Sequence, residues 1–94
     1  MKEKSCVVMK NKINTLAIML LINKEKSGKT DYFLVTCKKN KKAKQLINMA
    51  NKTKIPIFDE SAFVRAVYYL CDDGRIYYPE LTYWLNNWYE KYIN

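Results

Sequence analysis

The chain has 94 residues, of which 49% are hydrophobic and 14% aromatic, and its formal net charge is +8 at pH 7. This length supports one domain, and the apolar content is high enough for a core, which excludes two independent domains and a globally disordered chain. Residues 1–54 carry 14 lysines against three acidic residues, whereas residues 55–94 carry three basic residues against six acidic ones. A basic first half and a mildly acidic, aromatic second half indicate two surfaces with different partners. A coding bias toward lysine would also explain the excess of positive charge. It explains less well why that charge is concentrated in residues 1–54.

The use of cysteine and histidine limits the disulfides, metal sites and catalytic bases that the chain could form. Cys6, Cys37 and Cys71 lie far apart and show neither a disulfide nor a zinc-binding spacing, which is typical of a reducing cytoplasm. The chain has no histidine, the commonest metal ligand and general base. The apolar run 16–22 is much shorter than the roughly 20 residues of a membrane-spanning helix. We expect a soluble cytoplasmic protein without a cofactor, a metal ion or a membrane partner.

The first third of the chain contains one clear element and one ambiguous element. Residues 5–9 predict a short buried strand. In residues 11–25, Asn11 or Asn14 would cap a helix that runs to about Lys24. Residues 16–22 are apolar on every face, so a buried strand fits them as well. The length of the segment favours the helix, and the strand stays open.

The middle of the chain predicts a strand, a helix and a second strand. Residues 31–37 are rich in β-branched and aromatic side chains, which favours a strand. Residues 55–58 form a short apolar run in which Pro56 suits a sheet edge. Between them, the apolar residues of a lysine-rich segment recur at helical spacing, which predicts an amphipathic helix with a buried face of Ala43, Leu46, Ile47 and Ala50.

The last third predicts two helices separated by a turn at Gly74. Asp59 is a candidate N-cap of the first helix, whose apolar face contains Phe63, Val67 and Leu70. Pro79 suits the first turn of the second helix. The apolar stripe of that second helix consists of Leu81, Trp84, Leu85, Trp88 and Tyr92.

Alternation of strands and helices predicts a fold class. We expect a small three-layer α/β domain with a mostly parallel sheet and an additional aromatic C-terminal helix.

The motif Gly28-Lys29-Thr30 matches the end of a nucleotide-binding P-loop. The full motif, Gly-x-x-x-x-Gly-Lys-[Ser/Thr], would need a glycine at the position of Asn23, and a helix would have to follow Thr30. The residues after Thr30 favour a strand instead, so no helix N-terminus would face the phosphate. Entry into a sheet is the favoured interpretation, and nucleotide binding is the weakest alternative.

Residues 27–67 resemble BRCT domains, especially the bacterial type at the end of NAD-dependent DNA ligases. The resemblance lies in four consecutive segments, "GKTDYFLVT", "KKNKKAKQLINMA", "KIPIF" and "DESAFVRAV". No glycine precedes Gly28, although the family has glycines after its first strand and before its second. The resemblance therefore divides the chain into a divergent N-terminal part (1–26), a BRCT-like core (27–70) and a C-terminal turn and helix (71–94).

The resemblance implies a non-enzymatic interaction module that works in DNA replication or repair. Its partner would be the DNA backbone, a protein of DNA metabolism, or both. Lys41, Lys42 or Lys44 matches the lysine with which some members of this family hold a phosphopeptide. The hydroxyl and glycine partners of that lysine are absent here, which leaves a phosphopeptide site open.

Five lysines within seven residues form the strongest candidate binding surface. Lysine is a point charge, so such a cluster favours sequence-independent contact with backbone phosphates. A solvated helix face is the alternative interpretation. The candidate nucleic-acid contacts are Lys38, Lys39, Lys41, Lys42 and Lys44.

Aromatic residues supply the second candidate surface, since Tyr and Trp dominate protein interfaces. Trp84 and Trp88 are more typical of a helix core, so a core role is favoured for both. This surface suggests an alternative function, a small viral or mobile-element inhibitor or adaptor that binds one host protein. No arrangement of residues predicts catalysis, and the oligomeric state, which includes a possible dimer, stays open. The candidate partner contacts are Tyr77, Tyr78, Trp88, Tyr89 and Tyr92.

Overall fold

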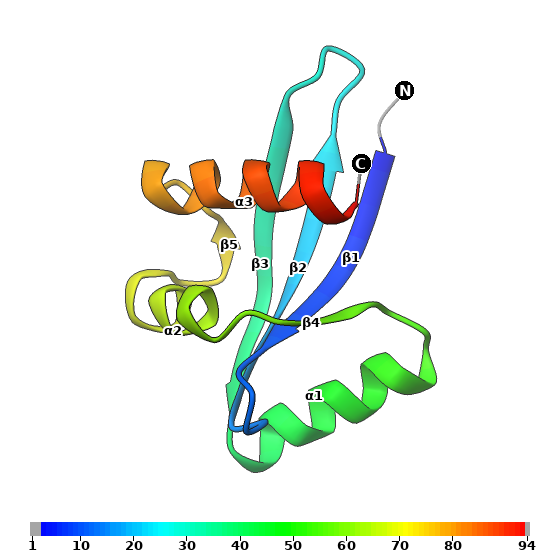
Figure 1. Ribbon diagram of the computed structural model, residues 1–94, viewed down its shortest axis with the longest axis vertical. Coiled ribbons are helices and arrows are strands. Elements are labelled where there is room, and N and C mark those ends of the chain that lie inside the picture. The colour runs from blue at the N-terminus through cyan, green and yellow to red at the C-terminus, as the bar shows by residue number, and fades with distance from the viewer. Residues whose placement is uncertain (1–2, 94) are drawn as a thin grey trace.

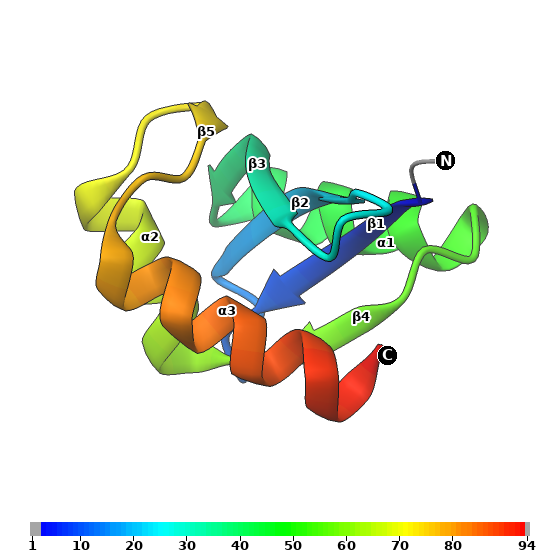
Figure 2. The same cartoon turned by 90° about the horizontal axis from the view of Figure 1, so that it is seen from above.

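The computed structural model describes residues 3–93, which form a five-stranded sheet with helices on both faces. Helix α1 lies on one face, and helices α2 and α3 cover the other, as the view from above shows (Figure 2). The three layers agree with the expected α/β architecture. In chain order the elements are β1 (Glu3–Lys10), β2 (Leu16–Lys24), β3 (Thr30–Lys39), α1 (Lys41–Lys52), β4 (Ile57–Asp59), α2 (Ser61–Leu70), β5 (Gly74–Arg75) and α3 (Pro79–Tyr92).

The sheet has the strand order β4-β1-β2-β3-β5 and is mostly antiparallel, so the expectation of a mostly parallel sheet is wrong. Strands β1, β2 and β3 form an antiparallel meander, and β5 pairs antiparallel with β3. Only β4 runs parallel to its neighbour, β1. Segments 11–15 and 25–29 are too short for the crossover that parallel neighbours require, and this sets the antiparallel order. The BRCT-like topology expected from residues 27–67 is therefore not confirmed.

Residues 16–24 form a strand, which corrects the favoured helix for residues 11–25. Asn11 does not cap a helix, because its Oδ1 accepts the backbone N–H groups of Thr15 and Leu16 at 2.9 and 3.0 Å within the β1–β2 turn. Asn14 lies in the same turn with a φ of 59°. Strand β2 is the central strand and packs against helices on both faces, which explains why its apolar residues show no periodicity (Figure 1).

A β-bulge interrupts the pairing of β2 with β3. Leu20 lies opposite Leu34 and Met19 lies opposite Thr36, so Val35 has no partner on β2. Val35 is 47% exposed. The bulge keeps Leu34 and Cys37 on the same face of the sheet, against α2 and α3.

The core has two parts, one on each face of the sheet. The smaller part lies under α1 and confirms the predicted helix face, since Ala43, Leu46, Ile47 and Ala50 are all buried. The larger part lies under α2 and α3, and its most deeply buried large side chains are Met9, Ile18, Leu20, Ile22, Tyr32, Leu34 and Leu85.

Two details of α2 differ from the expectation. Asp59 is not the N-cap but the last residue of β4, and its carboxylate pairs with Lys10 Nζ at 2.5 Å. Glu60 is at the N-cap position and makes no side-chain capping hydrogen bond. The buried face consists of Phe63, Val64 and Val67, whereas Leu70 is 49% exposed.

Helix α3 begins at Pro79 as expected and crosses the strands of the sheet (Figure 1). Its buried residues are Leu81, Leu85, Trp88 and Tyr89. Trp84 is partly buried and Tyr92 is 51% exposed. The buried stripe expected to include Tyr92 therefore includes Tyr89 instead, while Tyr92 stays half exposed and its ring lies 5.9 Å from that of Phe58 in β4.

Candidate nucleic-acid interface

The β1–β2 turn and the β3–α1 junction lie together at one end of the sheet (Figure 1). The backbone N–H of Asn40, between β3 and α1, donates to the carbonyl of Thr15 in the turn at 2.8 Å. This contact fixes the start of α1 relative to the sheet. Lys12, an exposed residue of the same turn, adds a positive charge at this end that the sequence analysis did not select.

The five predicted lysines lie at this end of the sheet, and we call them the basic surface. Lys38 and Lys39 are the last residues of β3, and Lys41, Lys42 and Lys44 lie in the first turns of α1. All except the half-buried Lys38 are exposed. The structure therefore brings the cluster together as the spacing predicted.

The basic surface extends to both faces of the sheet. Lys38 lines a shallow cavity together with Lys42 on the α1 side. Lys39 points to the other face, where its Nζ lies 6.0 Å from the ring centroid of Tyr68 in α2. Because successive side chains of a strand point to opposite faces, a polyanion that contacted both lysines would have to cross the end of the sheet.

The start of α1 offers hydrogen-bond donors as well as charge. Asn40 makes no side-chain capping hydrogen bond, and the first turn contains no acidic residue. The first N–H bonded within the helix is that of Lys44, which donates to the carbonyl of Asn40 at 3.2 Å. The preceding N–H groups are those that a helix leaves without an internal partner, and the helix dipole makes this end positive.

No acidic side chain neutralises the basic surface, since none of its five lysines forms an ion pair within residues 3–93. Ion pairs elsewhere in the described residues include those of Lys10 with Asp59 and of Arg75 with Asp31. The charge of the basic surface is therefore available to an external anion.

The structure divides the predicted partner contacts into two groups. Tyr77, Tyr78 and Tyr92 are 74%, 42% and 51% exposed, so a partner can reach them. Trp88 and Tyr89 are only 4% and 5% exposed, because both pack in the core under α3. A surface role for Trp88 and Tyr89 is thus corrected to a core role.

The exposed tyrosines do not form one surface. Tyr77 and Tyr78 precede α3, whereas Tyr92 is its last residue. The sequence analysis also missed Tyr69 and Tyr83, which are 75% and 71% exposed. Both lie in helices that the sequence predicted but outside their predicted apolar faces, which is the signal that could have identified them as exposed.

Gly28-Lys29-Thr30 does not form a phosphate loop. The backbone N–H of Gly28 donates to the carbonyl of Glu25 at 2.9 Å, within the turn that joins β2 to β3. Gly28 has a φ of 97°, which glycine adopts readily in such a turn. Thr30 begins β3, so a strand and not a helix follows the motif. The predicted entry into a sheet is confirmed.

The cysteines lack the environment of an activated nucleophile. Burial raises the pKa of the Cys37 thiol, with smaller contributions from Asp73 and Cys71 in the same direction. Burial likewise raises the pKa of Cys6 and of Cys71. Since the thiolate is the reactive form, these thiols are less reactive than an exposed cysteine at neutral pH.

Residues 3–93 contain neither a cluster of metal ligands nor a membrane-spanning helix. The described residues contain no group of three or more Cys, Asp and Glu side chains placed to hold a metal ion. No helix in this range is both long enough and apolar enough to cross a membrane.

Comparisons of the chain with models of protein families, with curated proteins and with solved structures found no match.

Proposed function

We propose that this chain is a non-enzymatic module that binds the sugar–phosphate backbone of DNA through the basic surface. The observation that carries the proposal is the set of unpaired lysines at the start of α1, where no acidic residue and no capping side chain satisfies the positive helix end. A role in replication or repair was expected only from the BRCT resemblance, so we do not include it.

Backbone phosphates match this surface in charge and in hydrogen bonding. Their oxygens accept hydrogen bonds from the ammonium groups of Lys41, Lys42 and Lys44 and from the free N–H groups of the first turn of α1. Lysine lacks the planar fork with which arginine reads guanine, so the contact carries no base information. Binding is therefore expected to be independent of sequence.

The placement of these lysines has an electrostatic cost that a phosphate would remove. Positive side chains in the first turn of a helix oppose the helix dipole, which favours acidic residues there. In the free protein Lys41 and Lys42 also repel each other. A bound phosphate offsets both effects, which supports binding rather than simple solvation as the role of the cluster.

Fluorescence anisotropy of labelled duplex and single-stranded DNA over a salt series tests the proposal. Each phosphate contact contributes about 0.9 to the slope of log affinity against log salt concentration. The variant with Lys41→Gln, Lys42→Gln and Lys44→Gln should therefore lower this slope by about 2.7 for duplex DNA. The matched control is Lys26→Gln, Lys29→Gln and Lys54→Gln, which removes the same charge outside the basic surface.

The two variants separate local contact from general attraction. The control should keep most of the wild-type slope. Equal losses in both variants would mean that only the net charge matters, and wild-type protein without measurable binding at low salt would refute the proposal. The alternative, an inhibitor or adaptor that binds one protein through aromatic residues, rests on the exposure of Tyr77 and Tyr92, which lie at opposite ends of α3 and would make two separate contacts.

A further inference from the structure

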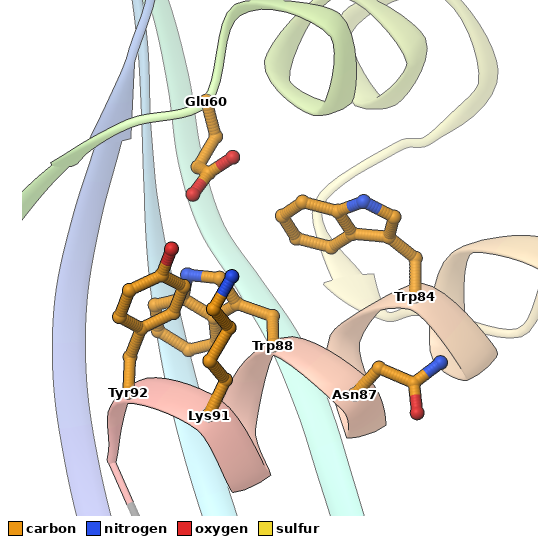
Figure 3. A pocket seen from close by; sticks show the side chains of 6 residues that line it. All are labelled: Glu60, Trp84, Asn87, Trp88, Lys91 and Tyr92. Carbon is orange, nitrogen blue, oxygen red and sulfur yellow. The ribbon is translucent and has the colours of Figure 1, made fainter.

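A cavity of about 240 Å³ lies between α3 and the segment that joins β4 to α2. It is on the face of the sheet opposite α1, so it is separate from the first turn of α1 (Figure 2). Figure 3 shows its side chains. They are Glu60, Trp84, Asn87, Trp88, Lys91 and Tyr92.

The aromatic walls of the cavity are held in place by packing. Trp84 stacks on Phe63 with ring centroids 4.2 Å apart and an interplanar angle of 10°. Trp88 lies edge-on to Phe58 at 5.0 Å and next to Tyr92 at 6.1 Å. Trp84 and Trp88 are nearly parallel, at 11°. Since neighbouring rings fix their orientation, a ligand would not have to order these walls.

The carboxylate of Glu60 points into the cavity, toward the aromatic rings (Figure 3). It makes no capping hydrogen bond to α2 and no ion pair within the described part of the chain. Burial is the largest cause of a raised pKa at Glu60. Lys91 and the Trp88 indole lower this pKa, whereas Asp59 raises it further. The negative charge of Glu60 is thus partly removed from water and incompletely compensated.

A second polar group of the cavity, the Trp88 indole N–H, is incompletely hydrogen-bonded among the described residues. Trp88 Nε1 is buried and has no hydrogen-bond partner of good geometry, although its N–H lies close enough to Glu60 to lower the pKa of that carboxyl group. Buried polar groups of folded proteins are nearly always paired. The carboxylate and the indole N–H satisfy each other only in part, which leaves hydrogen-bonding capacity for a ligand.

We propose that this cavity binds the guanidinium group of an arginine side chain presented by a partner polypeptide. A guanidinium is planar and stacks on aromatic faces, and its fork of N–H groups pairs with a carboxylate through two hydrogen bonds. Trp84 and Tyr92 supply the aromatic faces and Glu60 the carboxylate. The volume is below the roughly 300–1,000 Å³ of pockets for whole small molecules and suits one long side chain.

Lys91 acts as an internal competitor for this site. Its Nζ lies 5.3 Å from the ring centroid of Tyr92, so an ammonium group of the chain itself already occupies part of the aromatic wall. Lys91 is exposed and can turn toward solvent when an arginine enters. Removal of Lys91 should therefore strengthen arginine binding, whereas removal of the Glu60 charge should weaken it.

Intrinsic fluorescence gives a direct readout, because the chain has only two tryptophans and both line the cavity. The probes are three blocked tripeptides, Gly-Arg-Gly, Gly-Lys-Gly and Gly-citrulline-Gly, where citrulline is a neutral analogue of arginine. We expect a saturable change with the arginine peptide and a much weaker one with the other two. Glu60→Gln should weaken arginine binding about 10-fold to 100-fold, the effect of one charged hydrogen-bond partner. Lys91→Ala should strengthen it.

Each outcome bears on the proposal. Equal binding of the citrulline peptide would overturn a cation site, and equal binding of the lysine peptide would overturn the choice of guanidinium. Unchanged affinity in Glu60→Gln, or no saturable change even in Lys91→Ala, would overturn the site itself. Circular dichroism of both variants serves as the check that each is folded. Glutamine variants of Lys41, Lys42 and Lys44 serve as a control that should bind the arginine peptide like the wild type, since this inference is independent of DNA binding.

Discussion

Reversing the charge of Lys41 and Lys42 should stabilise the protein while it weakens DNA binding. Both residues are exposed and lie at the first two positions of α1, where their charge opposes the helix dipole. Lysine and glutamate have similar helix propensities, so the double variant Lys41→Glu/Lys42→Glu changes mainly electrostatics. Most substitutions destabilise a protein, which makes the expected sign unusual.

The magnitude follows from the position of the two residues. A charge near a helix end contributes about 0.3 kcal/mol when it is well exposed, and reversal changes an unfavourable contribution into a favourable one, which doubles it. Two reversals therefore stabilise the fold by about 1 kcal/mol, which corresponds to an increase in Tm of about 4–8 °C for a domain of this size.

Thermal unfolding followed by circular dichroism at low ionic strength measures this shift. The matched control is Lys52→Glu in the last turn of α1, where lysine is favourable and reversal should lower the Tm. Both variants reduce the net charge, so a general relief of repulsion would raise both Tm values. A double variant with an unchanged or lower Tm, or a control that rises with it, would refute the electrostatic argument. High salt should reduce both shifts.

Two other side chains give predictions of different kinds. Tyr32→Phe removes the hydrogen bond that the Tyr32 hydroxyl donates to Asn86 Oδ1 at 2.7 Å. Asn86 is exposed and can bind water instead, so urea unfolding should show a loss of about 1 kcal/mol, and a loss near zero would contradict a stabilising role for this bond. Burial raises the pKa of Glu60 above its usual 4.5, so the folded state binds this proton more tightly than the unfolded state. Ionisation of Glu60 therefore costs stability above its folded pKa, and the cost disappears as the pH falls toward 4.5. Glu60→Gln should be at least as stable as wild type at pH 7, with the difference closing at acidic pH; a variant that is clearly less stable at pH 7 would contradict this sign.

The amphipathic helix α1 could be predicted because one of its faces is buried and the other is in water. That asymmetry gives the helical spacing of Ala43, Leu46, Ile47 and Ala50. Strand β2 has no such asymmetry, since helices cover both of its faces. The sequence of residues 16–22 therefore carries no periodicity, and its secondary structure depends on tertiary contacts.

Asn11 did not distinguish the two candidate elements, and the length of the segment favoured the wrong one. An asparagine side chain that accepts backbone N–H groups occurs both at a helix N-cap and in a turn, and the local sequence is similar in the two cases. Here the acceptor serves the β1–β2 turn. Once this turn is recognised, the antiparallel order of β1 and β2 follows from its length.

The candidate sites were predictable to different degrees. The basic surface depends on residues adjacent in sequence, so Lys38 to Lys44 were found together. In α3, Tyr89 and Tyr92 fit the same helical stripe, and only the position of the sheet determines which one is buried. The cavity brings Glu60 to residues of α3 more than 20 positions away, a pairing for which the sequence contains no local signal.

The bulge at Val35 has a consequence for how the chain tolerates changes in length. Deleting one residue from an inner strand normally reverses the facing of every residue beyond it. Val35, however, has no partner on β2, and its two neighbours already pair with consecutive residues of that strand. A chain without Val35 would keep Cys37 against α2 and α3 and Lys38 on the opposite face, in an unbroken ladder. Cooperative unfolding of such a deletion variant would identify residue 35 as a position where β3 can lose an amino acid and retain its register.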